Sequence, residues 1–314
     1  FTSCSLLMGR ETPETTPMNI SRRILLESAL TAAAIQTASQ VDFLLAQNIP
    51  APATSKPKFA VFSKHFIGLP YERLAEIIAI CGADGIEAPI RPGGHMEPAK
   101  APDELPKLVD ALKKNGLEIT QLTSALTDTS PQSHAESLLR TAKALGIERY
   151  RLGFFKYDLG KPLWPQLDEI KTRLRDLVAM SKEIGILPCF QNHSGAGYVG
   201  AAIWDVADQL AWSFDIMHAT IEGNLSWPAE VALVKERIGI AYFKNFIWDN
   251  KRPQPAPLGE GIVGKPYVEM LRGSGYCGPV SLHVEYLRAK PTDPEGLATL
   301  VEATKRDMEV LRSW

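Results

Sequence analysis

Short β-type runs and longer stretches of helical pattern alternate along most of this chain. Eight runs of four to seven residues have the composition and length of buried strands. These runs are Phe59–Phe62, Gly85–Pro89, Glu118–Thr123, Tyr150–Phe154, Leu187–Asn192, Trp212–Ile216, Ile240–Phe246 and Val280–Tyr286. The pattern therefore predicts eight strands.

The segments between these runs carry apolar residues at i, i+3 and i+4, which predicts amphipathic helices. Such segments include Tyr71–Cys81, Glu104–Asn115, His134–Leu145, Leu167–Ile184 and Pro228–Arg237. Glycine stands where a helix C-terminal cap is expected at Gly82, Gly116, Gly146 and Gly185. Strands and helices thus alternate in a regular order.

Eight alternating β/α units in about 260 residues predict a (β/α)8 TIM barrel. A doubly wound sheet also alternates, but it usually carries a glycine-rich phosphate-binding turn after its first strand. Residues 62–66, which end and follow the first run, contain no glycine. A barrel is therefore favoured, and in a barrel the functional groups lie at the carboxyl ends of the strands.

The first 57 residues are expected to lie outside the barrel. We divide the chain into an upstream extension (1–17), a twin-arginine-type signal (18–47), a Pro/Ala linker (48–57) and the barrel (58–314). Arg22 and Arg23 precede a weakly apolar stretch, which predicts export, to the periplasm. The alternative is an amphipathic N-terminal helix, in which case the protein would stay in the cytoplasm.

Composition narrows the class of partner. Lys and Arg number 34 and Asp and Glu number 36, so the formal charge is −2. No broad positive field exists to attract a nucleic acid, and we expect no such partner. No stretch after the N-terminal segment approaches the roughly 18 uninterrupted apolar residues of a membrane span. A small molecule is the expected ligand, and the sequence leaves a homo-oligomer open.

Histidines gather at the predicted carboxyl ends of the strands. Of the six, only His134 lies in a helical segment. The other five are His65, His95, His193, His218 and His283. Because all strand ends of a barrel open on one rim, we expect these five side chains to line one polar pocket.

Carboxylates and amides join the histidines with strand spacing. Residues two apart share a face, which pairs Gln191 with His193, Tyr242 with Lys244, and His283 with Glu285. Polar groups facing the helices would be buried without partners, so these should point to the barrel mouth, where Asp215 also lies. Such a set of donors predicts a divalent ion, Mn²⁺, Mg²⁺, Co²⁺ or Zn²⁺. The alternative is a metal-free network of hydrogen bonds.

Five segments, in this order and spacing, resemble the xylose isomerase-like TIM barrels, which include sugar isomerases, ketose 3-epimerases, inosose dehydratases and endonuclease IV. They are Gly82–Glu87, Phe190–His193, Phe214–His218, Phe243–Asn245 and Gly278–Tyr286. The resemblance covers nearly all of Lys58–Trp314. It implies the same barrel and a carbohydrate substrate.

The resemblance also implies a set of metal ligands. In the sugar epimerases of this family a Glu, an Asp, a His and a Glu on strands five to eight bind the metal. Asp215 and Glu285 match, whereas Gln191 and Tyr242 replace the first Glu and the His. Gln191 can ligate through its oxygen but cannot accept a proton. His193 is the candidate for the missing ligand or base, so the expected ligands are Asp215, Glu285, Gln191 and His193.

The chemistry that the resemblance implies is metal-assisted proton abstraction next to a carbonyl, with Glu285 as base and His193, His218 or Lys244 returning the proton. Return to the other face gives epimerisation, transfer to the next carbon gives isomerisation, and loss of a β-leaving group gives a lyase. The expected substrate-binding residues are His65, Glu87, Arg91, His95, Arg151, Trp248 and His283.

Two other classes of function stay open from the sequence. A non-catalytic sugar-binding barrel is one, because a barrel that had lost catalysis would be expected to have replaced some of its metal ligands, as this chain has. A phosphodiesterase like endonuclease IV is the other, but the near-neutral charge and the replacements at Gln191 and Tyr242 argue against its multi-metal rim and basic groove.

Overall fold

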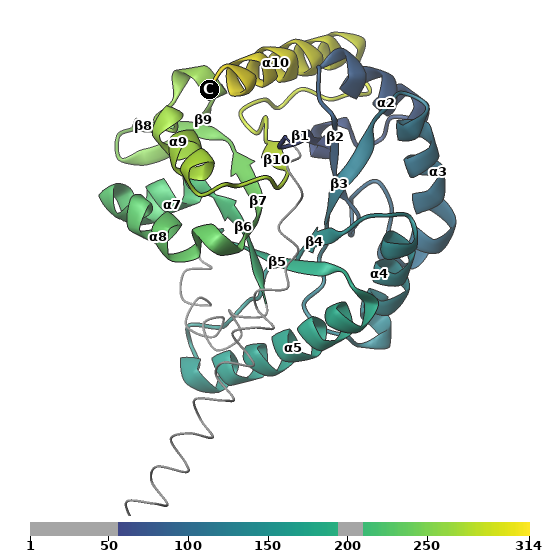
Figure 1. The fold of residues 1–314 in the computed structure, drawn as a ribbon, viewed down its shortest axis with the longest axis vertical. Coiled ribbons are helices and arrows are strands. Elements are labelled where there is room, and N and C mark those ends of the chain that lie inside the picture. The colour runs from purple at the N-terminus through teal and green to yellow at the C-terminus, as the bar shows by residue number, and fades with distance from the viewer. Residues whose placement is uncertain (1–55, 194–209) are drawn as a thin grey trace, which may run out of the picture. The chain divides into compact units, whose positions relative to one another are not determined.

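The computed structural model describes residues 56–193 and 210–314 of the chain. Within them, eight parallel strands close into a barrel in the order β1-β10-β7-β6-β5-β4-β3-β2 (Figure 1). These strands are β1 (Phe59–Phe62), β2 (Gly85–Pro89), β3 (Glu118–Thr123), β4 (Arg149–Arg151), β5 (Leu187–Gln191), β6 (Ala211–Asp215), β7 (Ile238–Phe243) and β10 (Val280–Leu282). The predicted (β/α)8 TIM barrel is confirmed. The predicted extension, export signal and most of the linker lie outside the described residues.

The barrel closes because its first and last strands pair in parallel. Ala60 of β1 lies opposite Ser281 of β10 on one side and Gly85 of β2 on the other. Every residue of β2 and of β6 is buried, as expected of strands covered by side chains inside and by helices outside. This two-sided burial explains why the runs show little alternation of polar and apolar residues.

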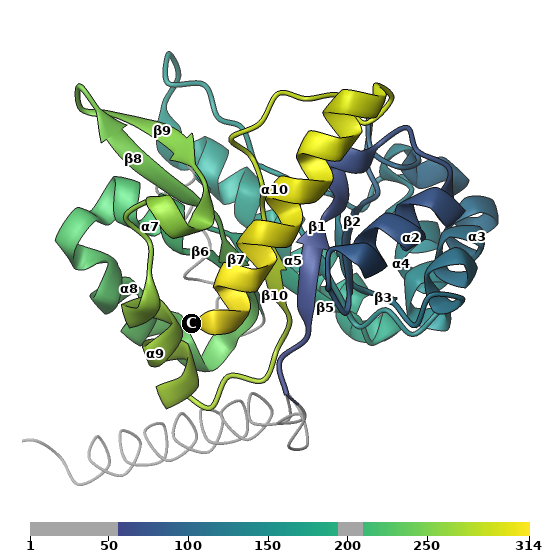
Figure 2. The same ribbon diagram turned by 90° about the horizontal axis from the view of Figure 1, so that it is seen from above.

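Helices cover the outside of the barrel (Figures 1 and 2). They are α2 (Tyr71–Ile80), α3 (Ala101–Lys113), α4 (Ala135–Ala144), α5 (Leu163–Ile184), α7 (Ile216–Gly223), α8 (Trp227–Val234), α9 (Lys265–Gly273) and α10 (Pro294–Ser313). The glycines predicted as caps have positive φ, and Gly185 at the end of α5 has a φ of 78°. Side chains with a Cβ are strained there, so these helices end where the sequence indicated.

Two of the differences between the helices and the predicted segments have a clear local cause. α5 begins at Leu163, before the predicted start at Leu167, because Pro165 falls in the first turn, where its missing N–H is tolerated. The helix α7 was not predicted. It follows β6 directly, and the Asp215 carboxylate caps it by accepting a hydrogen bond of 3.3 Å from the backbone N–H of His218. A strand that passes into a helix without a loop leaves no break in the sequence pattern.

Three barrel strands end three or four residues before the predicted runs do. The strands β4, β7 and β10 end at Arg151, Phe243 and Leu282. The residues that follow leave the sheet, because a turn or loop begins there. The predicted site residues Lys244 and Glu285 therefore lie just past the strand ends.

A hairpin follows β7 and was not predicted. Its strands β8 (Asn245–Asp249) and β9 (Arg252–Ala256) pair antiparallel outside the barrel, and Figure 2 shows them projecting at the end opposite the start of β1. Asn245 anchors its base, because its Nδ2 donates to the backbone oxygens of Leu258 (2.6 Å) and Val263 (2.9 Å). The predicted run Ile240–Phe246 thus joins two different sheets.

The interior has an apolar layer and a polar one. Leucines and isoleucines of the helices, such as Leu74 and Leu108, are fully buried against the outer faces of the strands. Inside the barrel Glu87 and Gln121 are also fully buried.

The helices of residues 56–193 and 210–314 are all too short or too polar to cross a bilayer.

Candidate functional site

Four ionisable side chains meet at the mouth of the barrel around Lys244. The Lys244 ammonium lies 2.9 Å from Asp215 Oδ2, 2.9 Å from His218 Nε2 and 3.3 Å from Glu285 Oε2. Lys244 is 4% exposed and Asp215 is fully buried. The sequence placed these four residues on one rim, and the structure brings them into direct contact.

Asp215 is held in place by Gln191, the last residue of β5, and by Asn192, which follows it. The Asn192 side chain donates from Nδ2 to the Asp215 backbone oxygen (3.0 Å) and accepts from the Asp215 backbone N–H (2.7 Å). Gln191 Nε2 donates to Asp215 Oδ2 at 2.8 Å. The carboxylate therefore has a fixed position at the junction of β6 and α7.

Their mutual charges keep Asp215, Lys244 and Glu285 ionised although all three are buried or partly buried. Burial alone would raise the pKa of Asp215, but the Lys244 ammonium together with His218 and His283 outweighs this and holds that pKa below its ordinary value. Burial opposes the charge on Lys244, yet Asp215 and Glu285 raise its pKa. The pKa of Glu285 falls far below its usual range, since Lys244, His283 and Lys64 together outweigh its burial. At neutral pH the site thus contains two carboxylates and an ammonium.

His218 is neutral in this setting. Burial lowers its pKa to about 4. An ammonium can only donate, so the Nε2 of His218 accepts from Lys244 and the ring proton lies on Nδ1. That Nδ1 is buried and has no hydrogen-bond partner among residues 56–193 and 210–314. The ring lies tilted by 45° against His193 with centroids 4.1 Å apart, and His193 in turn contacts Phe154.

A second group of polar side chains lies on the rim after β1 and β2. Lys64 pairs with Glu285 Oε1 at 2.7 Å. Burial and the charge of Lys64 lower the pKa of His65 to about 4, and no hydrogen-bond partner of its Nε2 lies in the described residues. Burial also lowers the pKa of His95 to about 4, and its Nε2 lies 2.8 Å from Ser63 Oγ. Both histidines therefore contribute neutral rings to the mouth.

Glu87 and His283 form a network inside the barrel, below the rim. Glu87 is fully buried, and its oxygens contact His283 Nε2 (2.9 Å), Ser281 Oγ (2.6 Å), Tyr242 Oη (3.0 Å) and Thr123 Oγ1. Burial alone would raise its pKa, but His283 and these hydrogen bonds lower it to about 2. No oxygen of Glu87 is left for a ligand, so the geometry does not support the expected substrate-binding role of this pair.

Arg91, Arg151 and Trp248 were expected to bind substrate. The Nη1 of Arg151 donates to Gln191 Oε1 at 2.5 Å, and its guanidinium lies 4.6 Å from the Phe154 ring centre. Arg91 lies beyond β2, with its guanidinium 5.9 Å from the Phe62 ring centre. Trp248 lies on the hairpin, 45% exposed. The structure thus joins Arg151 to the central cluster through Gln191, and it shows no such link for Trp248.

The described residues do not fit the divalent ion that the sequence led us to expect. Lys244 already fills the space between Asp215 and Glu285, and Arg151 takes the Gln191 oxygen. Nowhere in residues 56–193 and 210–314 are three His, Cys, Asp or Glu side chains arranged as ligands of one ion. The proposed ligation by Asp215, Glu285, Gln191 and His193 therefore gains no support from this geometry.

Three contributors to the site were not predicted: Ser63, Lys64 and Asn192. Ser63 and Lys64 directly follow β1, so the strand-end rule that selected His65 would also have selected them. Asn192 lies between Gln191 and His193, where strand alternation points it away from the mouth. Its role in holding the Asp215 backbone depends on the pairing of β5 with β6, which the sequence does not reveal.

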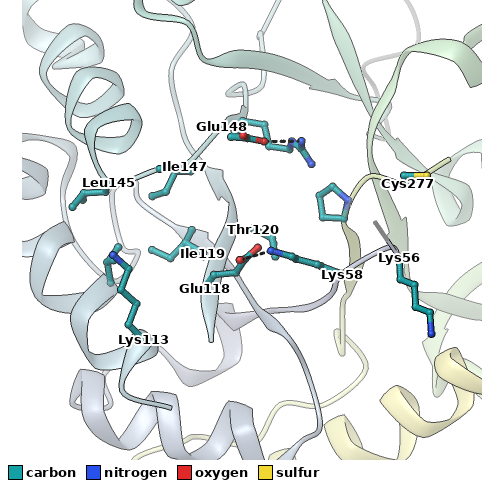
Figure 3. A pocket seen from close by; sticks show the side chains of 14 residues that line it. Lys56, Lys58, Lys113, Glu118, Ile119, Thr120, Leu145, Ile147, Glu148 and Cys277 are labelled. Carbon is teal, nitrogen blue, oxygen red and sulfur yellow. Dashed lines mark hydrogen bonds and ion pairs between the residues drawn. The ribbon is translucent and has the colours of Figure 1, made fainter. Parts of the chain in front are cut away.

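A separate cavity of about 360 Å³ lies at the other end of the barrel (Figure 3). Its lining includes Glu118 at the start of β3, Arg149 at the start of β4, Lys58 just before β1 and Lys113 at the end of α3. It contains none of the histidines or the central carboxylates. The chemistry-bearing residues are therefore at the mouth, at the carboxyl ends of the strands.

Comparisons with known proteins agree with this fold. The sequence profile described as xylose isomerase-like TIM barrel matches residues 75–314. No curated protein matches the chain.

Three solved structures show the same barrel. A 3-keto-D-glucoside 4-epimerase from E. coli is 18% identical, with a TM-score of 0.60, covering 82% of this chain and 100% of its own. A probable 3-DHS dehydratase from Bacillus anthracis is 16% identical, with a TM-score of 0.62, covering 81% and 98%. A xylose isomerase-like protein from Mycobacterium smegmatis in complex with magnesium is 16% identical, with a TM-score of 0.60, covering 82% and 97%. At such identities the likeness shows the fold.

The profile covers more than half of the chain, and the structure has the barrel that it describes. The chain therefore belongs to the xylose isomerase-like TIM barrel family.

Proposed function

We propose that this protein is an enzyme that moves a proton next to the carbonyl group of a sugar or sugar derivative, as an epimerase or isomerase does. The observation that carries the proposal is the direct contact of Asp215, His218, Lys244 and Glu285 at the barrel mouth. Perturbed, mutually coupled acids and bases at this position are typical of active sites. The likeness to a 3-keto-D-glucoside 4-epimerase is consistent with this class.

Glu285 is the base in this proposal. Its carboxylate is ionised, it is 24% exposed in its side chain, and it lies at the mouth between Lys64 and Lys244. It takes the proton from the carbon next to the carbonyl. The C–H electron pair becomes the C=C bond of an enediolate, and the carbonyl electrons move to oxygen. Because its pKa is depressed, Glu285 holds the proton only briefly and must pass it on.

His218 and His65 have the properties that the rest of the reaction needs. The Nδ1–H of neutral His218 has no acceptor, so it can donate a hydrogen bond to the oxygen on which negative charge develops. The His65 ring is neutral, has a free Nε2 and lies within the electrostatic reach of Glu285. It is suited to carry the proton to the product carbon.

The fate of the enediolate decides the reaction type. A proton returned to the opposite face gives an epimer, and one delivered to the adjacent carbon gives an isomer. A leaving group on the β-carbon gives dehydration instead. The dehydratase alternative is favoured by one observation, the equally good fold match to a probable 3-DHS dehydratase.

Exchange with solvent tests the shared first step. The protein is incubated with a panel of aldoses, ketoses and keto-sugars in D₂O, and ¹H NMR follows loss of the signal next to the carbonyl. Glu285→Gln should lose at least a hundredfold in exchange rate, because an amide cannot accept the proton. Glu260→Gln, the same change at an exposed residue, is the control and should leave the rate unchanged.

Absence of exchange with every compound, together with binding of one of them, would contradict an enzymatic role and identify a sugar-binding barrel. Exchange that survives Glu285→Gln would refute the assigned base. Product analysis of the exchanging compound separates an epimer, an isomer and a dehydrated product.

A further inference from the structure

Two carboxylates and a histidine surround the Lys244 nitrogen at hydrogen-bond distances, a spacing wider than that of ligands around one metal ion. Asp215 Oδ2 and His218 Nε2 each lie 2.9 Å from it, and Glu285 Oε2 lies 3.3 Å from it. Each of the three ammonium hydrogens thus has an acceptor. A buried lysine with this set of partners is a built part of the site, because an unpaired ammonium would be costly at 4% exposure.

A divalent ion at the same point would need these ligand atoms at about 2.0–2.6 Å. They would have to move in by roughly 1 Å, and the ammonium would have to leave. Lysine and metal therefore exclude each other at this position.

We propose that the Lys244 ammonium is the permanent cation of this site, held where a divalent ion would otherwise sit, so that the protein needs no metal. The inference rests on the proposed function in one respect, that the reaction takes place at the mouth of the barrel. Its test measures metal binding, so its failure and a failure of the proposed function can be told apart.

This arrangement gives Lys244 a positioning role. With all three hydrogens engaged, it has none left for a substrate oxygen. It keeps Asp215 and Glu285 together against their mutual repulsion. It also fixes the tautomer of His218, whose Nδ1–H is then the group that meets the substrate.

The experiment is a Mn²⁺ titration of the full protein after dialysis against EDTA, followed by electron paramagnetic resonance of free Mn²⁺. Wild type should bind no stoichiometric Mn²⁺ at concentrations up to 1 mM (on the order of the weakest protein sites for such ions). Lys244→Met removes the ammonium but keeps the side-chain volume, and it should bind one Mn²⁺ at least tenfold more tightly than wild type. Adding Asp215→Asn to that variant should abolish the gain.

Lys64→Met is the matched control. It also removes an ammonium from Glu285 (2.7 Å), but Lys64 is 40% exposed and contacts neither Asp215 nor His218 in the described residues. It should gain no Mn²⁺. Circular dichroism confirms folding, and Lys244→Gln is the second variant should Lys244→Met fail to fold. Stoichiometric metal in EDTA-treated wild type, or a folded Lys244→Gln or Lys244→Met protein without Mn²⁺ binding, would overturn the proposal.

An independent observation concerns two arginines at the same mouth. Arg151 is 4% exposed, and within the part of the chain that the structure describes its Nε has no partner and its Nη1 donates to the neutral amide of Gln191. Arg91 forms no hydrogen bond or ion pair with the described residues, and its guanidinium lies 5.9 Å from the Phe62 ring centre. Burial and the charge of Arg151 lower its pKa, while the weaker influence of the Glu87 and Glu285 charges acts in the opposite direction. A buried guanidinium without a carboxylate partner is costly unless a ligand supplies the anion.

We infer that Arg91 and Arg151 form an anion subsite, so that the substrate is a sugar derivative carrying a carboxylate or a phosphate group. Both anions match the planar donor fork of arginine. The Phe154 ring under Arg151 fixes the orientation of that fork. This inference names the substrate class of the proposed function and would stand for a sugar-binding barrel as well.

Calorimetric titration with D-glucose, D-glucuronate and D-glucose 6-phosphate tests it. At least one anionic compound should bind tenfold or more tightly than glucose, and the two anions distinguish a carboxylate subsite from a phosphate subsite. Arg151→Gln and Arg91→Gln should each remove the preference. Arg140→Gln on the surface, where the partners are Glu136 and Glu183, should not. Equal binding of all three compounds, or a preference that survives both mouth variants, would refute the subsite.

Discussion

Glu87→Gln is expected to weaken the fold rather than to act through the substrate. The substitution keeps the shape of the side chain and removes its charge. In the native barrel the carboxylate accepts from Ser281, Tyr242 and Thr123 and pairs with His283, with no exposure to solvent. The neutral amide places an N–H₂ group where Ser281, Tyr242, Thr123 and His283 now meet a carboxylate oxygen, so buried donors lose their acceptor.

Two routes give the size of the effect. Folding lowers the pKa of Glu87 from 4.5 to about 2, which at about 1.4 kcal/mol per pKa unit corresponds to about 3 kcal/mol of stability at neutral pH. Leaving a buried hydrogen-bond donor without its acceptor typically costs about 1–3 kcal/mol, and Glu87 accepts from several buried donors. We therefore expect a loss of about 3 kcal/mol and a fall in Tm of roughly 6–12 °C for a domain of this size.

The effect should depend on pH in a defined direction. Because folding lowers this pKa, the ionised group stabilises the barrel fully above pH 4.5, and the contribution is lost as the pH falls towards 2. The difference between wild type and Glu87→Gln should shrink to roughly 1.5 kcal/mol at pH 3.

Urea unfolding followed by circular dichroism measures both quantities. Glu118→Gln is the control, because Glu118 pairs with Lys58 on the surface, where their side chains are 44% and 53% exposed (Figure 3). An exposed pair contributes about 0–1 kcal/mol. A loss below 1 kcal/mol for Glu87→Gln, or one equal to that of the control, would refute the reasoning.

Other expectations follow from the same geometry. Burial lowers the pKa of His95 to about 4, so the unfolded chain takes up a proton on this residue before the folded chain does as the pH falls below 6.5. Because of this residue, wild type should be about 2 kcal/mol less stable at pH 5 than at pH 7.5. In urea titrations His95→Gln should remove that part of the pH dependence of stability, and an unchanged pH dependence would count against the prediction. Asn192→Ala should slow deuterium exchange into the sugar by roughly tenfold or more, because Asp215 loses both hydrogen bonds that hold its backbone. The circular dichroism spectrum should stay native. An unaltered exchange rate would mean that Asp215 needs no such support. A protein beginning at Pro57 should keep the Tm of the full chain, because β1 starts at Phe59, and a broad or lowered transition would show that the preceding segment belongs to the fold.

Much of the candidate site could be predicted because one rule acts on every strand of a barrel. The residues that close each run open on the same rim, and this rule alone selected Asp215, His218, Lys244 and Glu285. It did not separate the rim from the layer below it. Glu87 and His283 satisfied the same pattern, yet they form a closed pair inside the barrel. Strand alternation fixes the face to which a side chain points, but its height in the barrel depends on the register between strands.

The sequence by itself determined the eight β/α units, the glycine caps and the set of ionisable groups at the mouth. These follow from local periodicity and backbone conformation, which neighbouring residues set. The tertiary structure alone decided the pairings: Lys244 with Asp215 and Glu285, Asn192 with the Asp215 backbone, and Arg151 with Gln191. Such contacts join residues up to 41 positions apart, and only closure of the barrel brings them within hydrogen-bond distance. The same carboxylates and histidine could bind a metal ion or accept hydrogen bonds from a lysine. Only the three-dimensional arrangement therefore decides which of the two they surround.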